Sequence, residues 1–166
     1  MKRLLPLLLI AASLPGCGLR PLYAGGSEGA VAQSLRDIEV APIEGKGGWL
    51  VRNAINDRLA AVPSASPRYR LVVKLDDEIT GFGVRSDDSI TRERRTLRAR
   101  YQLIEMGGDK VVLDATAGSD AGIDVTSSEY ATIAAENTAL ERLAQTVADQ
   151  IISRLALYAT RSANGQ

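Results

Sequence analysis

The stretch "ITRERRTLRARY", residues 90–101, holds the side chains best suited to bind a ligand. Its arginines recur at two-residue steps: Arg92, Arg94, Arg98 and Arg100. On a β-strand these four side chains point to one face, because side chains alternate along a strand. Like charges on one stripe repel one another, and the forked guanidinium matches the paired oxygens of phosphate. The pattern therefore predicts a sheet face that binds an anion.

A second interpretation of the same stripe stays open at this point. The arginines could line a solvated outer face of the sheet, with Glu78 or Asp114 on neighbouring strands as cross-strand partners. In either case Lys74 and Arg70 on the preceding strand would extend the basic area.

The only cysteine, Cys17, follows an apolar run at the start of the chain. Lys2 and Arg3 precede that run, which ends at Leu14 and is shorter than the roughly 20 apolar residues of a transmembrane helix. It is therefore typical of an export signal that is removed. The sequence Leu-Pro-Gly-Cys at positions 14–17 resembles a lipobox, although Pro15 replaces the usual Ala, Ser or Thr.

Lipidation of Cys17 would tie the mature protein to a membrane. Two or three acyl chains, at about 0.8 kcal/mol per buried methylene, give lasting attachment where one chain does not. Gly18 follows the cysteine in place of aspartate, which favours the outer membrane over retention at the inner one. We expect the protein on the periplasmic side of that membrane.

The composition excludes several kinds of site. The chain has 166 residues and no histidine, so it has no Ser-His-Asp triad and lacks the commonest metal ligand. Asp76-Asp77-Glu78 and Asp87-Asp88 lack calcium-loop spacing and are more simply solvated turns. Lys plus Arg equals Asp plus Glu, so no global basic field favours nucleic acid. We predict no enzyme activity, no cofactor and no bound metal.

The strands that must position the arginines are predicted from the alternation of apolar and polar residues. The predicted strands are residues 37–43, a strand from Tyr69 that continues toward Thr80, residues 90–104, and a strand from Val111 to Ala117. Leu97, Ala99, Tyr101 and Leu103 are expected in the core, with Val111, Leu113, Ala115 and Ala117 opposite them. Gly81-Phe82-Gly83 suggests a bend, and Gly107-Gly108-Asp109 indicates a tight hairpin.

Two helices are predicted from apolar spacing of three and four residues. The first spans Trp49 to Ala61 after a glycine-rich loop at 45–48, with Trp49 as a core or staple residue. The second begins at a capping box with Thr126 as N-cap and runs to about Thr160. Its core face is expected to include Ile133, Leu140, Ala144, Val147, Ile151, Leu155 and Tyr158.

These elements predict an α+β fold, a two-layer sandwich. A mostly antiparallel four-stranded sheet carries two helices on one face and leaves the other face open. The predicted organisation is a signal peptide at 1–16, a lipidated N-terminus and tether at 17–34, a domain at 35–160 and a tail at 161–166.

Several segments together resemble one known family. The lipidated start "CGLRPLY" (17–23), "LVRNAINDRL" (50–59), "RARYQLIE" (98–105) and "ALERLAQTVADQIISRL" (139–155) are similar to the LPS-assembly lipoprotein family LptE. The resemblance implies a non-enzymatic outer-membrane lipoprotein that plugs the LptD β-barrel and supports the binding, transport and assembly of lipopolysaccharide. The stripe offers Arg92, Arg94, Arg98 and Arg100, with Lys74 beside them, as residues for that ligand.

Two other functions compete with this hypothesis. An auxiliary periplasmic lipoprotein of a phospholipid ABC transport complex would share the anchor and the small α+β domain. It would be found with an inner-membrane transporter in place of a barrel. A lipid-anchored hydrolase is disfavoured, because the chain has no histidine.

Overall fold

A computed structural model describes residues 30–59, 66–84 and 90–163. The elements along the chain are α2 (Ala30–Arg36), β1 (Ile38–Val40), α3 (Gly45–Leu59), β2 (Tyr69–Val84), β3 (Ile90–Glu105), β4 (Lys110–Asp124) and α4 (Glu129–Ala163). No helix within these described ranges is long and apolar enough to span a membrane.

The four strands form one sheet in the order β1-β2-β3-β4. β2, β3 and β4 pair antiparallel as successive hairpins, whereas β1 pairs parallel to β2. β1 is parallel because α3 carries the chain back along the sheet before β2 begins, as in any strand–helix–strand crossover. The predicted α+β fold is confirmed, and the sheet is mixed.

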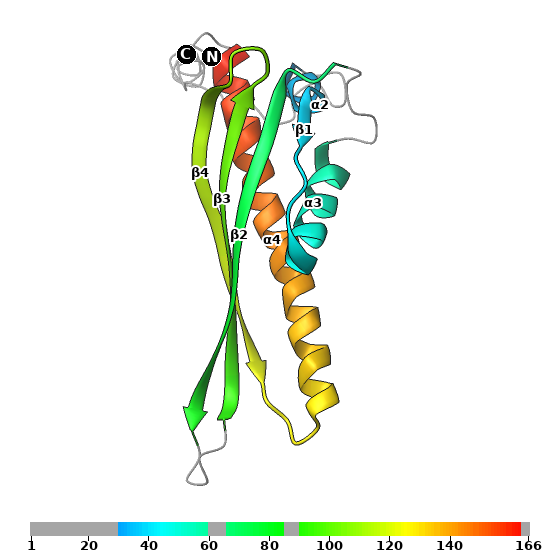
Figure 1. The fold of residues 1–166 in the computed structure, drawn as a ribbon, viewed down its shortest axis with the longest axis vertical. Helices are drawn as coiled ribbons and strands as arrows, with labels where there is room; N and C mark the ends of the chain where they lie inside the picture. The colour runs from blue at the N-terminus through cyan, green and yellow to red at the C-terminus, as the bar shows by residue number, and fades with distance from the viewer. Residues whose placement is uncertain (1–29, 60–65, 85–89, 164–166) are drawn as a thin grey trace, which may run out of the picture.

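The helices lie on one side of the sheet and differ greatly in length (Figure 1). α4 follows almost the whole sheet, while α2 and α3 cover only the half that contains β1 (Figure 1). α3 and α4 run parallel: Lys46 donates a 2.6 Å hydrogen bond to Asn137, and Arg58 donates one of 2.8 Å to Gln145. The distal part of the sheet, residues 77–84 and 90–97, therefore extends beyond α3.

The core lies between the sheet and the helices. The predicted inward set of β3 is confirmed, because Leu97, Ala99, Tyr101 and Leu103 are all buried. From α4, Leu140, Ala144, Val147, Ile151 and Leu155 meet them, and α3 adds Val51, Ala54 and Ile55. Tyr69 and Tyr158 pack edge to face at the end of this cluster, with ring centroids 6.3 Å apart.

The prediction that Val111 faces the core is wrong. Leu103 pairs with Leu113, but Ile104 pairs with Val111, so Val112 is the extra residue of a β-bulge. A bulge shifts the alternation by one residue. As a result Val112 packs against the core and Val111 is exposed.

The glycine-rich stretch at 45–48 was predicted as a loop, but it forms the first turn of α3. Gly48 is required there by contact, because a Cβ at this position would lie 2.5 Å from the carbonyl oxygen of Ile43. Trp49 is 63% exposed, so its prediction as a core or staple residue is also wrong. The first buried side chain after it is Val51, on the opposite side of the turn.

The start of α4 also differs from the prediction. The helix begins at Glu129, so Ser128 and not Thr126 is the N-cap. The Ser128 hydroxyl accepts a hydrogen bond from the Ala131 amide at 3.4 Å, as a capping side chain does three residues ahead. Ile133, expected in the core, is 47% exposed because it lies one turn before Asn137, the α4 residue that the first turn of α3 contacts.

Other boundaries shift by a few residues. α2 falls partly in the segment predicted as a tether, and its Leu35 is buried in the core. β2 continues past the suggested bend to Val84, with the backbone in the left-handed region only at Gly83. The prediction that Asp76-Asp77-Glu78 forms a turn is therefore wrong, because these residues lie within β2. α4 continues to Ala163.

We expect Leu97→Ala to lower the free energy of unfolding by about 2–5 kcal/mol, because it leaves a cavity in a closely packed core. Leu97 is 0% exposed on the central strand β3. Leu157→Ala is the matched control: Leu157 is 41% exposed on α4, so the same truncation should cost less than about 1 kcal/mol. Urea unfolding followed by circular dichroism measures both; equal costs would contradict the assigned core.

Candidate functional site

The open face of the sheet holds the five cations predicted from the sequence. Lys74 comes from β2, and Arg92, Arg94, Arg98 and Arg100 come from β3, all at even positions of the alternation. They share one face because Leu97, Ala99, Tyr101 and Leu103, at the odd positions, are buried on the other. β4 adds a third row to this face, with Asp114, Asp120 and Asp124.

Three of the arginines are paired with this acidic row. The distances are 3.2 Å for Arg92–Asp124, 2.9 Å for Arg98–Asp120 and 3.0 Å for Arg100–Asp114. The expected partner Asp114 is confirmed, whereas Glu78 makes no such pair in the described chain. Each of these aspartates neutralises one arginine, so the row of arginines is not a continuous positive surface.

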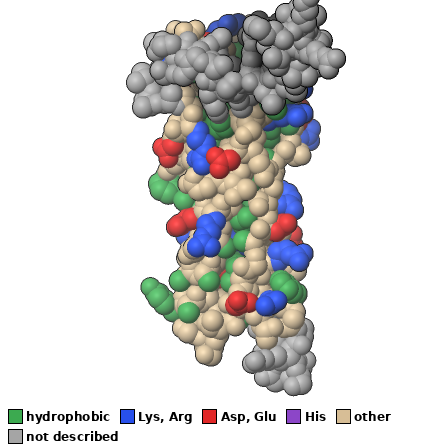
Figure 2. Space-filling view, turned by 180° about the vertical axis from the view of Figure 1, so that it is seen from behind, with side chains coloured by type: hydrophobic (Ala, Val, Ile, Leu, Met, Phe, Trp, Pro, Cys, Tyr) green, Lys and Arg blue, Asp and Glu red, His purple; other side chains and the backbone are tan. Residues whose placement is uncertain are grey.

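Figure 2 shows the side of the molecule turned away from the view of Figure 1, which carries both basic and acidic side chains. Basic and acidic side chains lie in neighbouring pairs along its length. No large area of a single sign dominates this face (Figure 2). Since the chain also has no net charge, neither this face nor the whole chain provides a strong field of one sign.

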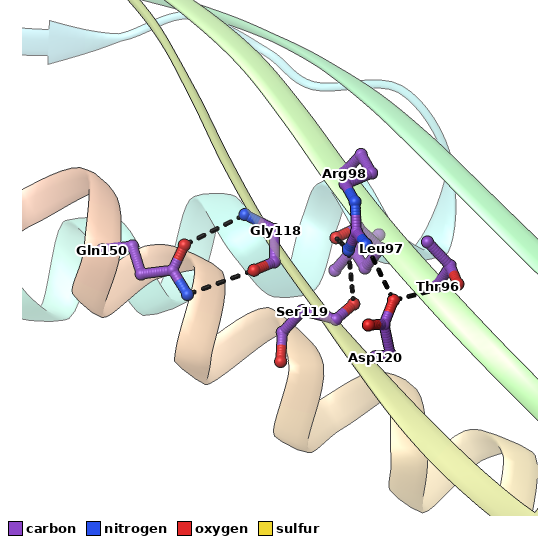
Figure 3. A network of polar contacts seen from close by, with 7 residues as sticks. All are labelled: Thr96, Leu97, Arg98, Gly118, Ser119, Asp120 and Gln150. Atoms are coloured by element: carbon purple, nitrogen blue, oxygen red, sulfur yellow. Dashed lines mark hydrogen bonds and ion pairs between the residues drawn. The ribbon is translucent and has the colours of Figure 1, made fainter.

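Arg98 extends from β3 toward the neighbouring strand β4 to reach its aspartate (Figure 3). Gly118 is directly opposite Arg98, and a Cβ there would lie 2.4 Å from Cδ of Arg98. The guanidinium passes over this glycine and donates to the Ser119 carbonyl at 3.1 Å and to Asp120 at 2.9 Å. Thr96 also donates to Asp120, at 3.1 Å.

The backbone of Gly118 is held from its other side by α4 (Figure 3). The Gln150 side chain accepts from the Gly118 amide at 3.0 Å and donates to the Gly118 carbonyl at 3.2 Å. Both bonds lie at the outer edge of β4, since its other edge pairs with β3, where Arg98 is opposite Gly118. No local pattern indicated this contact, because it joins residues 32 positions apart.

The carboxylates of the open face are stabilised in their charged form. The pKa of Asp114 is lowered first by the hydrogen bond from Arg100 and then by that from Gln102. The pKa of Asp120 is lowered first by the Thr96 hydroxyl and then by Arg98, against some desolvation. The pKa of Arg100 is raised by its bond to Asp114. These pairs therefore stay ionised at neutral pH.

Two of the predicted cations remain without an acidic partner in the described residues. Arg94 lies over the Phe82 ring, with its guanidinium carbon 5.4 Å from the ring centroid. Lys74 has no ion pair there and is directly opposite Arg100 across the β2–β3 ladder. Like charges opposite each other are unfavourable in a sheet. A bound anion would therefore reduce the repulsion between Lys74 and Arg100 most.

A shallow open depression of ≈ 640 Å³ lies over this pair. Lys74, Arg98 and Arg100 line it, together with Thr116 and the side-chain-free surface of Gly118. The Thr116 hydroxyl lies opposite Arg100 on β4 and adds a donor. Asp76 also lines the depression, so it suits one anionic group and not a dense negative surface.

A second arginine site, missed by the sequence analysis, lies on the inner face. Arg95 binds Asp77 through two hydrogen bonds of 2.8 and 2.7 Å, and it donates to the Glu136 carbonyl of α4 at 3.0 Å. It thus joins β2, β3 and α4. The hydrogen bond that Arg95 donates to Asp77 outweighs desolvation and raises the pKa of Arg95. The signal available was the break in spacing at "RR", which puts Arg94 and Arg95 on opposite faces.

The predicted lipidation site, Cys17, and the acidic pair at 87–88 lie outside the described residues. Cys17 therefore stays a prediction.

Comparison with known proteins adds a family to this geometry. The family model LptE, described as lipopolysaccharide-assembly, matches residues 35–155, which is most of the chain. No curated protein sequence matches. This is the family that the sequence motifs resemble, so that prediction is confirmed.

Solved structures show the same architecture. A putative lipoprotein from Caulobacter crescentus is 26% identical, with a TM-score of 0.67 over 81% of this chain and 98% of that one. The rare lipoprotein B from Shewanella oneidensis is 10% identical, with a TM-score of 0.58 over 78% of this chain and 98% of that one. A lipoprotein B from Nitrosomonas europaea, also 10% identical, gives 0.57 over 78% and 86%. At 10% identity the last two support the fold alone.

We expect Gly118→Ala to displace Arg98 and to lower the free energy of unfolding by about 1 kcal/mol, as is common when one contact is disturbed. Gly122→Ala is the matched control on the same strand, because nothing lies within 4 Å of a Cβ at that position. Urea unfolding gives the stability, and NMR of the arginine side chains shows whether Arg98 leaves Asp120. Equal effects of the two substitutions would contradict the crossing of Arg98 over Gly118.

We expect Arg100→Gln to raise the pKa of Asp114 toward the ordinary aspartate value of about 3.9, because the guanidinium bond is its largest cause of depression. A lowered folded pKa gives stability above the unfolded pKa that is lost as the pH falls through the folded value. The variant should therefore lose less stability than the wild type below about pH 4.

Carbon-detected NMR titration of Asp114 measures this directly. Lys74→Gln is the control, since Lys74 makes no ion pair with Asp114. An unchanged Asp114 pKa in Arg100→Gln would show that Gln102 alone, with its 2.8 Å bond, holds the charged form.

Proposed function

Because the chain belongs to the LptE family of lipopolysaccharide-assembly proteins, we propose that it is a lipid-anchored subunit of the outer-membrane machinery that assembles lipopolysaccharide. Its role is structural and ligand-binding, as is usual for this non-enzymatic family of lipoproteins. Cys17 carries the anchor, and a β-barrel of the LptD type is the partner. The observation that carries the proposal is the family match over residues 35–155, which contains all four strands.

The ligand in this proposal is the phosphorylated, anionic part of lipopolysaccharide. Lys74 and Arg100 bind it from adjacent strands, with the Thr116 hydroxyl beside them. Arg98 lines the same depression but is engaged with Asp120 and Ser119. A phosphate that binds Arg100 must compete with Asp114, so binding exchanges one ion pair for another.

Exposed side chains on the helices support a large protein partner. Trp49 on α3 and Tyr130 on α4 are both mostly exposed. Aromatic residues are enriched where proteins meet, because they bury a large area and lose little conformational entropy. These two residues are therefore candidates for contact with a barrel wall.

The partner is tested by gentle detergent extraction of the outer membrane, with a tag at the C-terminus of the protein and mass spectrometry of what co-purifies. We expect a large β-barrel of the LptD type at one copy per copy of this protein. Recovery of the protein alone, or with an inner-membrane transporter, would overturn the proposal.

The ligand is tested with the double variant Lys74→Ala/Arg100→Ala. We expect its affinity for purified lipopolysaccharide to fall about tenfold or more, since a hydrogen bond to a charged group contributes about 1.5–3 kcal/mol. The control is Arg142→Ala/Arg154→Ala, which removes the same charge from exposed positions of α4. If both variants lose the same affinity, binding reflects overall charge, and the open face is not the ligand site.

A further inference from the structure

The fold protects one edge of its sheet at a central position. β4 is an edge strand of 15 residues, and an edge strand offers unpaired backbone groups to other chains. At Gly118 the Gln150 side chain accepts from the amide and donates to the carbonyl, as a neighbouring strand would. A strand added along β4 would have to displace Gln150. α4 therefore disfavours strand addition at this edge.

The other edge is covered only in part. β1 pairs with β2 at Tyr69–Leu71, and one further bond joins the Ala41 amide to the Leu71 carbonyl at 3.0 Å. Backbone groups of alternate residues point to the same side of a strand. The groups of Asp77, Ile79 and Gly81 therefore face the same edge as those of Leu71. Within the described ranges they have no backbone partner there.

Apolar side chains lie uncovered beside this open edge on the inner side of the sheet. α3 begins at Gly45 and approaches β2 near Asp77, whose carboxylate would be 3.6 Å from a Cβ on Gly47. Beyond this point Ile79 is 39% exposed. Ile133, 47% exposed, is one turn before Asn137, the residue that Lys46 of α3 contacts. It thus lies on the side of α4 along which a longer α3 would continue.

The outer side of the same edge is acidic. Asp76 and Glu78 flank Asp77 on the open face, and neither carboxylate makes an ion pair or a hydrogen bond among the described residues. Asp77 itself is engaged by Arg95 on the inner side. Opposite charges on adjacent strands stabilise a sheet. An incoming strand would therefore match this edge best with basic side chains on the open face.

We propose that residues 76–81 of β2 form a docking edge for an extended segment of another protein. The segment adds to the sheet as a strand next to β2 and pairs with the backbone of Asp77, Ile79 and Gly81. Its apolar side chains face Ile79 and Ile133, and its basic side chains face Asp76 and Glu78. The guarded β4 edge directs such a segment to β2. This inference does not depend on the proposed role in lipopolysaccharide assembly.

The experiment uses the full mature chain in detergent micelles and a capped nonapeptide of alternating lysine and valine as the probe. Amide hydrogen exchange is followed residue by residue by NMR. We expect the Ile79 and Gly81 amides to exchange about tenfold or more slowly with saturating peptide, as a newly bonded amide does. The Thr116 and Gly118 amides on the β4 edge should not change. A valine–glutamate peptide of the same length should give no protection.

Ile79→Pro tests the edge with little effect on the β2–β3 ladder, because the Ile79 amide points away from β3. It should abolish the protection of Gly81. Thr116→Pro is the matched control, since the Thr116 amide points to the outer edge of β4 as that of Gly118 does. It should leave peptide binding unchanged. If Ile79→Pro fails to fold, Ile79→Lys places a charge on the apolar side and should also prevent binding.

Three results would overturn the proposal. The first is no change in exchange at Ile79 and Gly81 with saturating peptide. The second is protection at the β4 edge in place of the β2 edge. The third is protection without peptide that grows with protein concentration, which would make a second copy of this chain the occupant.

Discussion

The structure depends on the alternation of β3, the central strand of its long hairpins. Leu97, Ala99, Tyr101 and Leu103 are buried against α3 and α4, and burial of this apolar set stabilises one register. A slip by one residue would place arginines in the core, where unpaired charge is very costly. The same register sends Arg98 and Arg100 to the open face. The core therefore fixes the geometry of the proposed ligand site.

The open face is a network of paired charges. The aspartates of β4 lie within reach of the arginines of β3 because β4 follows β3 through a short hairpin. Exposed pairs of this kind contribute little to stability. They do decide which cations are available, since Lys74 stays without an acidic partner among the described residues, while Arg98 is held over Gly118. A ligand on this face therefore exchanges partners with the protein.

A mismatch in length between the two layers leaves surface for other molecules. The sheet and α4 extend well beyond the start of α3 (Figure 1). Ile79 and Ile133 are exposed for this reason. Arg95 lies beside this uncovered part and joins β2, β3 and α4. The protein thus has one edge held by Gln150 and another that is open beside an apolar flank. Because of this difference between the two edges, a partner strand would bind at the β2 edge and not at the β4 edge.

The sequence alone determined the fold class, the alternation of β3 and the core face of most of α4, because each follows from local spacing of apolar residues. It also indicated the family, through the order of several weak motifs. The tertiary structure decided what local spacing does not contain. Ile133 is exposed because α3 begins at Gly45 and does not extend to it, and Trp49 is exposed because it lies on the side of α3 opposite Val51. The inversion at Val111 depends on a bulge between paired strands. The partners of Arg95 and Gly118 lie 18 to 41 positions away. Such contacts arise only when distant segments pack together, so no local pattern could have revealed them.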